Sequence, residues 1–298
     1  MYLIAGSTGY VGSSLADELA RRGAEVRCMA RSPERAEGRF DGRCEVVRGD
    51  VLEPETLDAA LDGVELAYYL VQSMGRGGDG DFAERDRRGA RNFAEAAARQ
   101  GVSRVVYLGG LGEGRSEHLR SRHETAEALA STEIPLTYFR AAIVIGSGSE
   151  SLRTIAFLVK RLLAMVTPIW TETRTQPIAA RDVVAYLAAA PDVPASAGRE
   201  IEIGGREVTT YGELLDRAAE AQGVRPRPRV GVPLLSPSLS SRWIGLVTPV
   251  DAGVARPLVE GLTTETVVED LSGMELFDVE PTPLREAMAE AVPEALAA

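Results

Sequence analysis

The stretch Gly6-Ser7-Thr8-Gly9-Tyr10-Val11-Gly12 lies between the apolar run Leu3-Ile4-Ala5 and the segment SSLADELARRG (13–23). This context predicts a tight turn from a buried strand into an amphipathic helix. Three glycines at this spacing permit the sharp turn, let a phosphate approach the backbone, and let the helix pack closely on the strand. The amide groups at the start of the helix would then face an anion. The stretch therefore predicts a dinucleotide-binding site, against the alternative of a plain strand-to-helix turn.

The end of the second predicted strand, 25–30, bears on which dinucleotide binds. A site for NAD usually places an acidic residue there, about 20 residues beyond the glycines, to bind the ribose 2′-hydroxyl. This chain has Ala30 followed by Arg31. A guanidinium can pair with a 2′-phosphate, and no carboxylate repels it, so Arg31 and, as a second candidate, Arg35 favour NADP over NAD.

Composition limits the partners of the chain. Its 298 residues suffice for a nucleotide-binding domain and a smaller companion. The net charge of −11 argues against nucleic acid, which needs a basic face. The two cysteines have no metal-ligand spacing, and no signal peptide or membrane span is apparent. We expect a cytoplasmic protein without a bound metal, for which peripheral association with a membrane or a larger complex stays open.

Predicted strands and helices alternate over the first half of the chain. This alternation is typical of βαβ units on a parallel sheet and predicts a doubly wound α/β (Rossmann) core over residues 1–146, which 174–205 rejoin. Ligands of such sheets bind beyond the carboxyl ends of the strands. Residues 147–298 are expected to form mainly a small cap, with a helix over 151–165, an irregular proline-rich stretch over 225–237 and an apolar segment at 240–247.

Further motifs accompany the glycine turn: GDV (49–51), Asn92 within the predicted helix 81–100, and RAAIVIG (140–146). Together they resemble the extended and atypical short-chain dehydrogenase/reductase superfamily. The stretches AYYLVQSM (67–74), FAERDRRGARNF (82–93), YLGGLG (107–112) and LVTPV (246–250) resemble more narrowly its NmrA-like branch, akin to the nucleotide-binding subunit of respiratory complex I.

The resemblance implies roles for individual residues. Contacts to the pyrophosphate are implied for Gly6, Thr8, Gly9, Tyr10, Val11 and Gly12. Asp50 and Val51 would lie near the adenine, Val71 and Gln72 near the nicotinamide ribose, and Gly109 under the nicotinamide ring.

The chain departs from this family at the catalytic groups. Typical members use a tyrosine four residues before a lysine, which lowers the pKa of the phenol for proton exchange with a carbonyl or alcohol. Lys160 is the only lysine here, and position 156 is alanine. Alignment on Pro135 places the lysine position at Arg122 and the tyrosine position at His118. The customary serine falls at Gly109-Gly110.

His118 and Arg122 are therefore the candidate catalytic residues. Four residues apart, they share a helix face, and an imidazole with an ordinary pKa near 6.5 could donate a proton to a carbonyl or quinone oxygen. Arg122 could bind the cofactor ribose or orient a carboxylate. The alternative for His118 is a solvated residue at the start of a helix.

Several functions compete at this point. The first is an NADPH-dependent oxidoreductase acting on an apolar carbonyl or quinone, as apolar residues of the expected cap suggest (Leu162, Leu163, Met165, Trp170 and Trp243). The second, a non-catalytic NADP(H)-binding sensor or regulator, is favoured by the replaced catalytic groups. The third, a structural or assembly subunit, is suggested by the complex I resemblance. A nucleotide-sugar epimerase is a weaker alternative, because epimerases normally keep the tyrosine and lysine.

Overall fold

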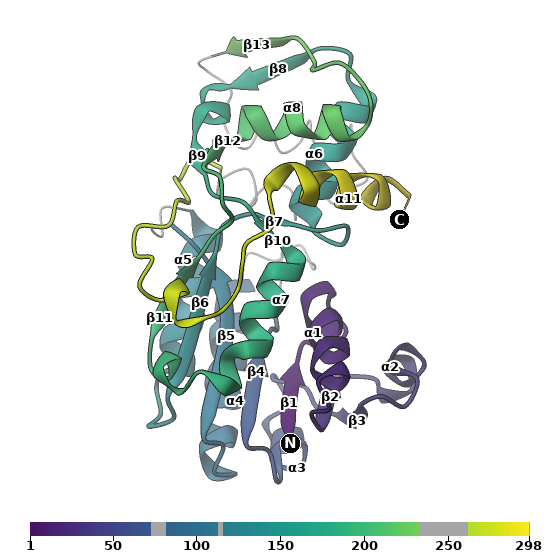
Figure 1. Cartoon of the computed structure of the whole chain (residues 1–298). Helices are drawn as coiled ribbons and strands as arrows, with labels where there is room; N and C mark the ends of the chain where they lie inside the picture. Colours follow the sequence, from purple (N-terminus) through teal and green to yellow (C-terminus); the bar gives the residue numbers. More distant parts are fainter. Residues whose placement is uncertain (73–81, 113–115, 233–261, 298) are drawn as a thin grey trace.

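A seven-stranded parallel sheet forms the centre of the computed structural model, which describes residues 1–72, 82–112, 116–232 and 262–297 (Figure 1). Its strands, in spatial order, are β11 (Glu200–Ile203), β6 (Leu136–Ala141), β5 (Arg104–Gly110), β4 (Leu66–Tyr69), β1 (Tyr2–Ala5), β2 (Val26–Ala30) and β3 (Glu45–Arg48). All neighbouring strands pair in parallel. The predicted doubly wound α/β fold is confirmed. The chain reverses direction across the sheet between β1 and β4, where such folds bind ligands.

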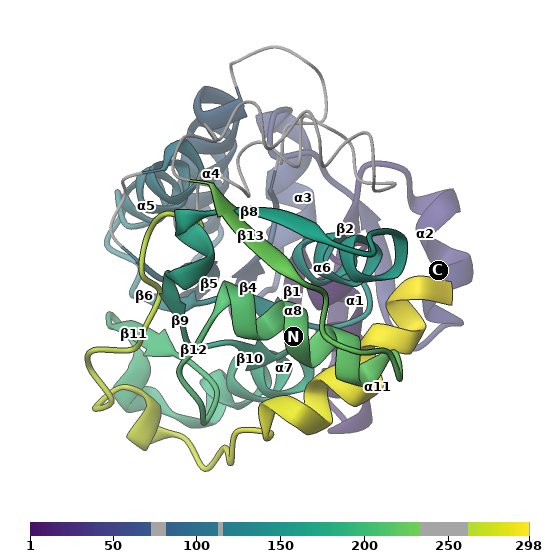
Figure 2. The ribbon, with the colours of Figure 1, turned by 90° about the horizontal axis from the view of Figure 1, so that it is seen from above.

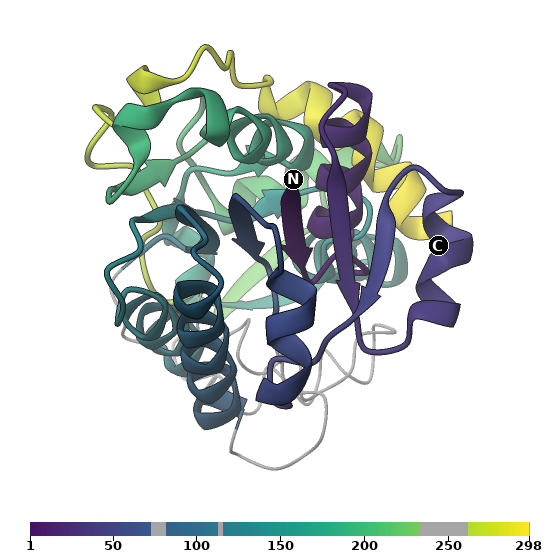
Figure 3. The same ribbon diagram turned by 90° about the horizontal axis from the view of Figure 1, so that it is seen from below.

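Helices cover both faces of the sheet, and for this reason the central strands β1 and β4 carry apolar or aromatic residues on both faces. One face carries α1 (Tyr10–Arg21), α2 (Pro33–Phe40) and α7 (Ala180–Ala189). The other carries α3 (Leu57–Leu61), α4 (Phe82–Arg99) and α5 (Glu117–Leu129). Figure 3 shows these two helical layers from below, on opposite sides of the strands.

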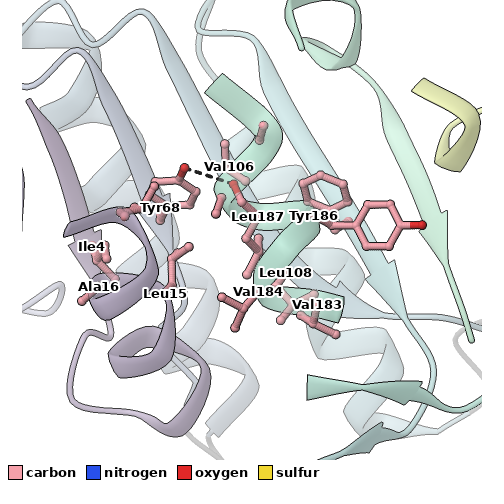
Figure 4. Close-up of a cluster of buried hydrophobic side chains, with 14 of the residues drawn as sticks. Ile4, Leu15, Ala16, Tyr68, Val106, Leu108, Val183, Val184, Tyr186 and Leu187 are labelled. Atoms are coloured by element: carbon pink, nitrogen blue, oxygen red, sulfur yellow. Dashed lines mark hydrogen bonds between the residues drawn. The ribbon is translucent and has the colours of Figure 1, made fainter. Parts of the chain in front are cut away.

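The core on the α1 face extends from the first strand to residues far along the chain. Ile4 and Leu15 pack near Tyr68, and α7 adds Val183 and Leu187 (Figure 4). The Tyr68 hydroxyl donates a hydrogen bond to the Leu187 carbonyl at 3.1 Å, which satisfies a fully buried phenol. Thus α7 completes the layer that holds α1, and with it the glycine turn, against the sheet.

A third apolar core lies beyond the carboxyl ends of the strands, among α6 (Glu150–Arg161), α8 (Tyr211–Ala221) and α11 (Leu284–Ala297). Figure 2 shows β8 (Met165–Pro168) and β13 (Arg229–Val232) side by side above these helices. The shorter elements are β7 (Val144–Ile145), β9 (Arg174–Thr175), β10 (Ile178–Ala179), β12 (Thr209–Thr210), η1 (Pro54–Thr56), η2 (Ile169–Glu172), η3 (Ala190–Asp192), η4 (Pro194–Ser196) and η5 (Met274–Leu276).

Two expectations for the second half of the chain are wrong. The helix expected over 151–165 begins at Glu150, because the Ser149 hydroxyl caps it by accepting from the Leu152 amide, and it ends at Arg161; Met165 belongs to β8. Within the stretch expected to be irregular, 229–232 forms β13, because it pairs in parallel with β8, 64 residues earlier. The segments 240–247 and 246–250 lie outside the described residues. Among the described helices, none is long and apolar enough to cross a membrane.

Candidate functional site

The glycine turn joins β1 to α1 at the carboxyl edge of the sheet, and two of its glycines are required by the backbone itself. Gly6 has a φ of +89°, and a Cβ there would lie 2.6 Å from the Leu70 carbonyl group. A Cβ at Gly12 would lie 2.2 Å from the Gly6 carbonyl oxygen. These contacts fix the tight turn and the close approach of α1 to the strand.

Gly9 differs from its two neighbours in the motif. Its φ and ψ of −74° and 167° are open to any residue, and a Cβ there would meet only the Gly6 oxygen, at 3.2 Å. Gly9 is the N-cap of α1 and provides no side-chain cap for the first helical amides. These amides have no acceptor inside the helix and attract an anion. The turn thus offers open space beside a helix N-terminus, as a diphosphate requires.

One arginine contacts the outer side of this turn. Arg31, at the end of β2, is exposed, as is Arg35 on α2. Arg39, which the sequence did not single out, reaches back from the last turn of α2 and donates hydrogen bonds to the Thr8 carbonyl at 3.1 Å and to the Ser13 hydroxyl at 3.0 Å. Arg39 therefore joins Arg31 and Arg35 as a candidate to bind a 2′-phosphate.

A cavity of about 430 Å³ opens beyond the strand ends and includes the glycine turn in its wall. Nine residues proposed from the sequence line it: Gly6, Gly9, Tyr10, Val11, Gly12, Gln72, Gly109, His118 and Arg122. The other six, Thr8, Arg31, Arg35, Asp50, Val51 and Val71, lie outside this lining. Asp50 accepts from the Leu52 amide at 2.9 Å, and the Val51 carbonyl accepts from Asn92 at 2.8 Å, so both stabilise the loop after β3.

Glycines shape the cavity at the end of β5. A Cβ at Gly109 would lie 2.7 Å from the Tyr138 ring, and a Cβ at Gly110 would lie 2.7 Å from Leu119. Tyr138 stacks on Tyr107 with ring centroids 5.1 Å apart. No side chain fits at either glycine without displacing its neighbours, so the backbone itself forms this part of the wall.

His118, Leu119 and Arg122 face the cavity from the first turns of α5. The Ser116 hydroxyl caps this helix by accepting from the Leu119 amide at 3.2 Å. Arg122 donates a 2.6 Å hydrogen bond from one terminal guanidinium nitrogen to the Gln72 side-chain carbonyl. The two predicted catalytic residues are thus brought together on one wall.

The expected protonation of His118 is wrong for the folded chain. Burial, together with the nearby positive charge of Arg122, lowers the pKa of His118 to about 3. The imidazole is therefore neutral at pH 7. It can donate one hydrogen bond, but it is not a reservoir of an acidic proton.

The apolar wall of the cavity comes from other residues than those expected. Leu163 is 81% exposed, and Met165 and Leu162 pack in the third core; none of the three lines the cavity. The side chain of Trp170 and all of Trp243 lie outside the described part of the chain. Strand ends and the loops after them supply the apolar lining instead: Leu70, Leu108, Leu111, Ile143 and Val144.

The cavity also contains residues from the second half of the chain that sequence reasoning missed. Ser149 and Glu150 line it from the start of α6, and Tyr211 and Thr266 line it from positions later in the sequence. Only the serine before the helix carried a signal, as an N-cap; the others reach the cavity through tertiary packing.

The chain is similar in sequence to known NAD(P)H-binding proteins and reductases. Residues 6–141 match a family described as NAD(P)H-binding. The chain is 26% identical to a ceramide reductase from Caulobacter vibrioides over 297 residues, covering 97% of this chain and 88% of the relative. It is 31% identical over 232 residues to the (4-alkanoyl-5-oxo-2,5-dihydrofuran-3-yl)methyl phosphate reductase of Streptomyces griseus, covering 76% and 75% of the two chains.

The fold is similar to that of an NADPH-dependent quinone oxidoreductase from Escherichia coli, solved in complex with NADPH. The TM-score is 0.75 at 19% identity, with 99% of this chain and 100% of that chain covered.

Proposed function

Because the chain belongs to the NAD(P)H-binding family of the short-chain dehydrogenase/reductase superfamily, we propose that it is an NADPH-dependent reductase of apolar, conjugated carbonyl compounds or quinones. The observation that carries the proposal is the single cavity shared by the glycine turn and the His118–Arg122 wall. Its volume of about 430 Å³ lies within the usual range for small-molecule sites. A cofactor and an acceptor would meet there.

The residues present fit the cofactor. The open space at Gly9 and the unpaired amides of α1 suit a diphosphate, and the bare backbone at Gly109 suits a flat ring. Arg31 and Arg39 favour a 2′-phosphate, since no carboxylate follows β2 directly. When bound, the reduced nicotinamide would supply the hydride.

The side chains around the acceptor would act mainly by orientation and charge. A neutral His118 donates a hydrogen bond to the acceptor oxygen, and the Arg122 guanidinium adds positive charge to the same wall. The apolar strand ends exclude water. Because His118 is neutral at pH 7, the proton that completes the reduction comes from solvent.

A non-catalytic NADP(H) sensor is the second candidate. The low pKa of His118 favours it, because the imidazole at the tyrosine position is neutral near pH 7 and has no acidic proton to transfer. In that case the cavity would bind a ligand without reducing it.

NADPH oxidation, followed by absorbance against a panel of naphthoquinones, cinnamaldehyde and saturated aldehydes, separates the two. The proposal predicts saturable turnover with the conjugated acceptors above that with the saturated ones. Tight NADPH binding without turnover on any acceptor would replace the reductase with the sensor.

A further inference from the structure

Arg122 is a buried cation whose hydrogen-bonding capacity is only partly used. The residue is 8% exposed, and its carbonyl oxygen accepts from the Tyr107 hydroxyl at 3.2 Å, which holds that turn of α5 in place. One terminal nitrogen donates to Gln72. The other is buried and has no hydrogen-bond partner within the described chain. A buried donor group is therefore left unsatisfied on a side chain that lines the cavity.

Within the described residues, the charge of this guanidinium has no anionic partner: its side-chain acceptor there is Gln72, which supplies only a neutral oxygen. The carboxylate in the described lining is Glu150, 3.9 Å from Arg153 at the start of α6. A buried cation with an open donor is costly unless a ligand supplies the partner.

The surroundings of Arg122 define the rest of such a ligand. Leu119 lies one residue from His118 on the same wall, and Leu111 and Ile143 add further apolar surface. A ligand that satisfies both parts has an apolar body and one anionic oxygen group.

We propose that Arg122 and Gln72 form an anion-binding subsite for a carboxylate or phosphate carried by an apolar substrate. The inference rests on the reductase function proposed above and makes its acceptor an anionic compound. A cationic acceptor is disfavoured at this wall, because its charge would face the positive charge of Arg122.

Titration calorimetry on the full chain saturated with NADP⁺ tests the subsite without turnover. The probes are trans-cinnamate, phenyl phosphate and the neutral cinnamamide. We expect at least one of the two anions to bind about tenfold or more tightly than cinnamamide, and the comparison between them tells carboxylate from phosphate. Arg122→Met should remove the difference, Arg122→Lys should restore part of it, and Arg120→Met, at an exposed arginine of the same helix, should keep it.

Three results would overturn the subsite: equal affinity for anions and cinnamamide, unchanged anion binding in a folded Arg122→Met protein, or anions that bind the cofactor-free chain and are displaced by NADP⁺. The last would assign the guanidinium to the cofactor instead. If NADP⁺ itself does not bind the wild-type chain, the proposed function fails, and the same probe comparison in the cofactor-free chain still decides the role of Arg122.

Discussion

Replacing Gly9 by valine should weaken cofactor binding about 100-fold and leave the fold intact, whereas replacing Gly12 by alanine should damage the fold. At Gly9 the backbone is extended, a conformation that β-branched residues accept, and a Cβ meets one atom at 3.2 Å. The cost to folding should stay below about 1 kcal/mol. At Gly12 an added Cβ would lie 2.2 Å from the Gly6 carbonyl oxygen, so the turn must move. We expect this to lower the free energy of unfolding by about 1 to 3 kcal/mol or more.

The effect of Gly9→Val on binding follows from the contacts that the valine methyls would displace. A hydrogen bond to a charged group contributes about 1.5 to 3 kcal/mol. Loss of two amide contacts to a diphosphate therefore weakens binding by about 3 kcal/mol or more, which is about 100-fold.

Two measurements on each variant check this prediction: NADPH titration by fluorescence and urea unfolding by circular dichroism. The reasoning is refuted if Gly9→Val binds NADPH within about threefold of wild type, since 3 kcal/mol corresponds to over 100-fold. It also fails if Gly9→Val unfolds the chain more than Gly12→Ala does.

The other predictions concern charge. Removing Arg31 and Arg39 together should weaken NADPH binding about tenfold or more in calorimetry and leave NADH unchanged, because only the 2′-phosphate needs them; equal losses for both cofactors would contradict this. His118 should show no protonation by NMR between pH 5 and 8, and a titration near pH 6.5 would refute its burial. Because the pKa of His118 is lower in the folded chain than in the unfolded chain, the free energy of unfolding should decrease as pH falls below about 6.5. His118→Gln should remove this pH dependence. Arg104→Met should destabilise by about 2 to 4 kcal/mol in urea unfolding, because Thr137 and the Ala190 carbonyl lose a buried donor, without changing NADPH affinity; a loss of affinity would link the amino end of β5 to the cavity.

The sequence allowed the fold to be predicted because the deciding signals are local. The glycine turn lies at the junction of an apolar run and an amphipathic helix, and both are encoded within residues 3–21. The neighbouring strand β4, Leu66-Ala67-Tyr68-Tyr69, is also a continuous buried run. By contrast, 229–232 becomes a strand only through its pairing with 165–168, which no local pattern specifies.

The candidate site was predictable in composition but not in electrostatics. The position of His118 four residues before Arg122 predicts a shared helix face, and both line the cavity. The low pKa of His118 depends on burial by elements distant in sequence, so an ordinary value was expected. Arg39 contacts Thr8 only because α2 folds back toward the turn.

A crystal structure of the chain with NADP⁺ tests the central claim most directly, because the claim is that one cavity holds both cofactor and acceptor. The account predicts the diphosphate against the amides of Tyr10 and Val11, and the nicotinamide ring beside Gly109, facing His118 and Arg122. Cofactor density away from the glycine turn, or a nicotinamide ring outside this cavity, would contradict it.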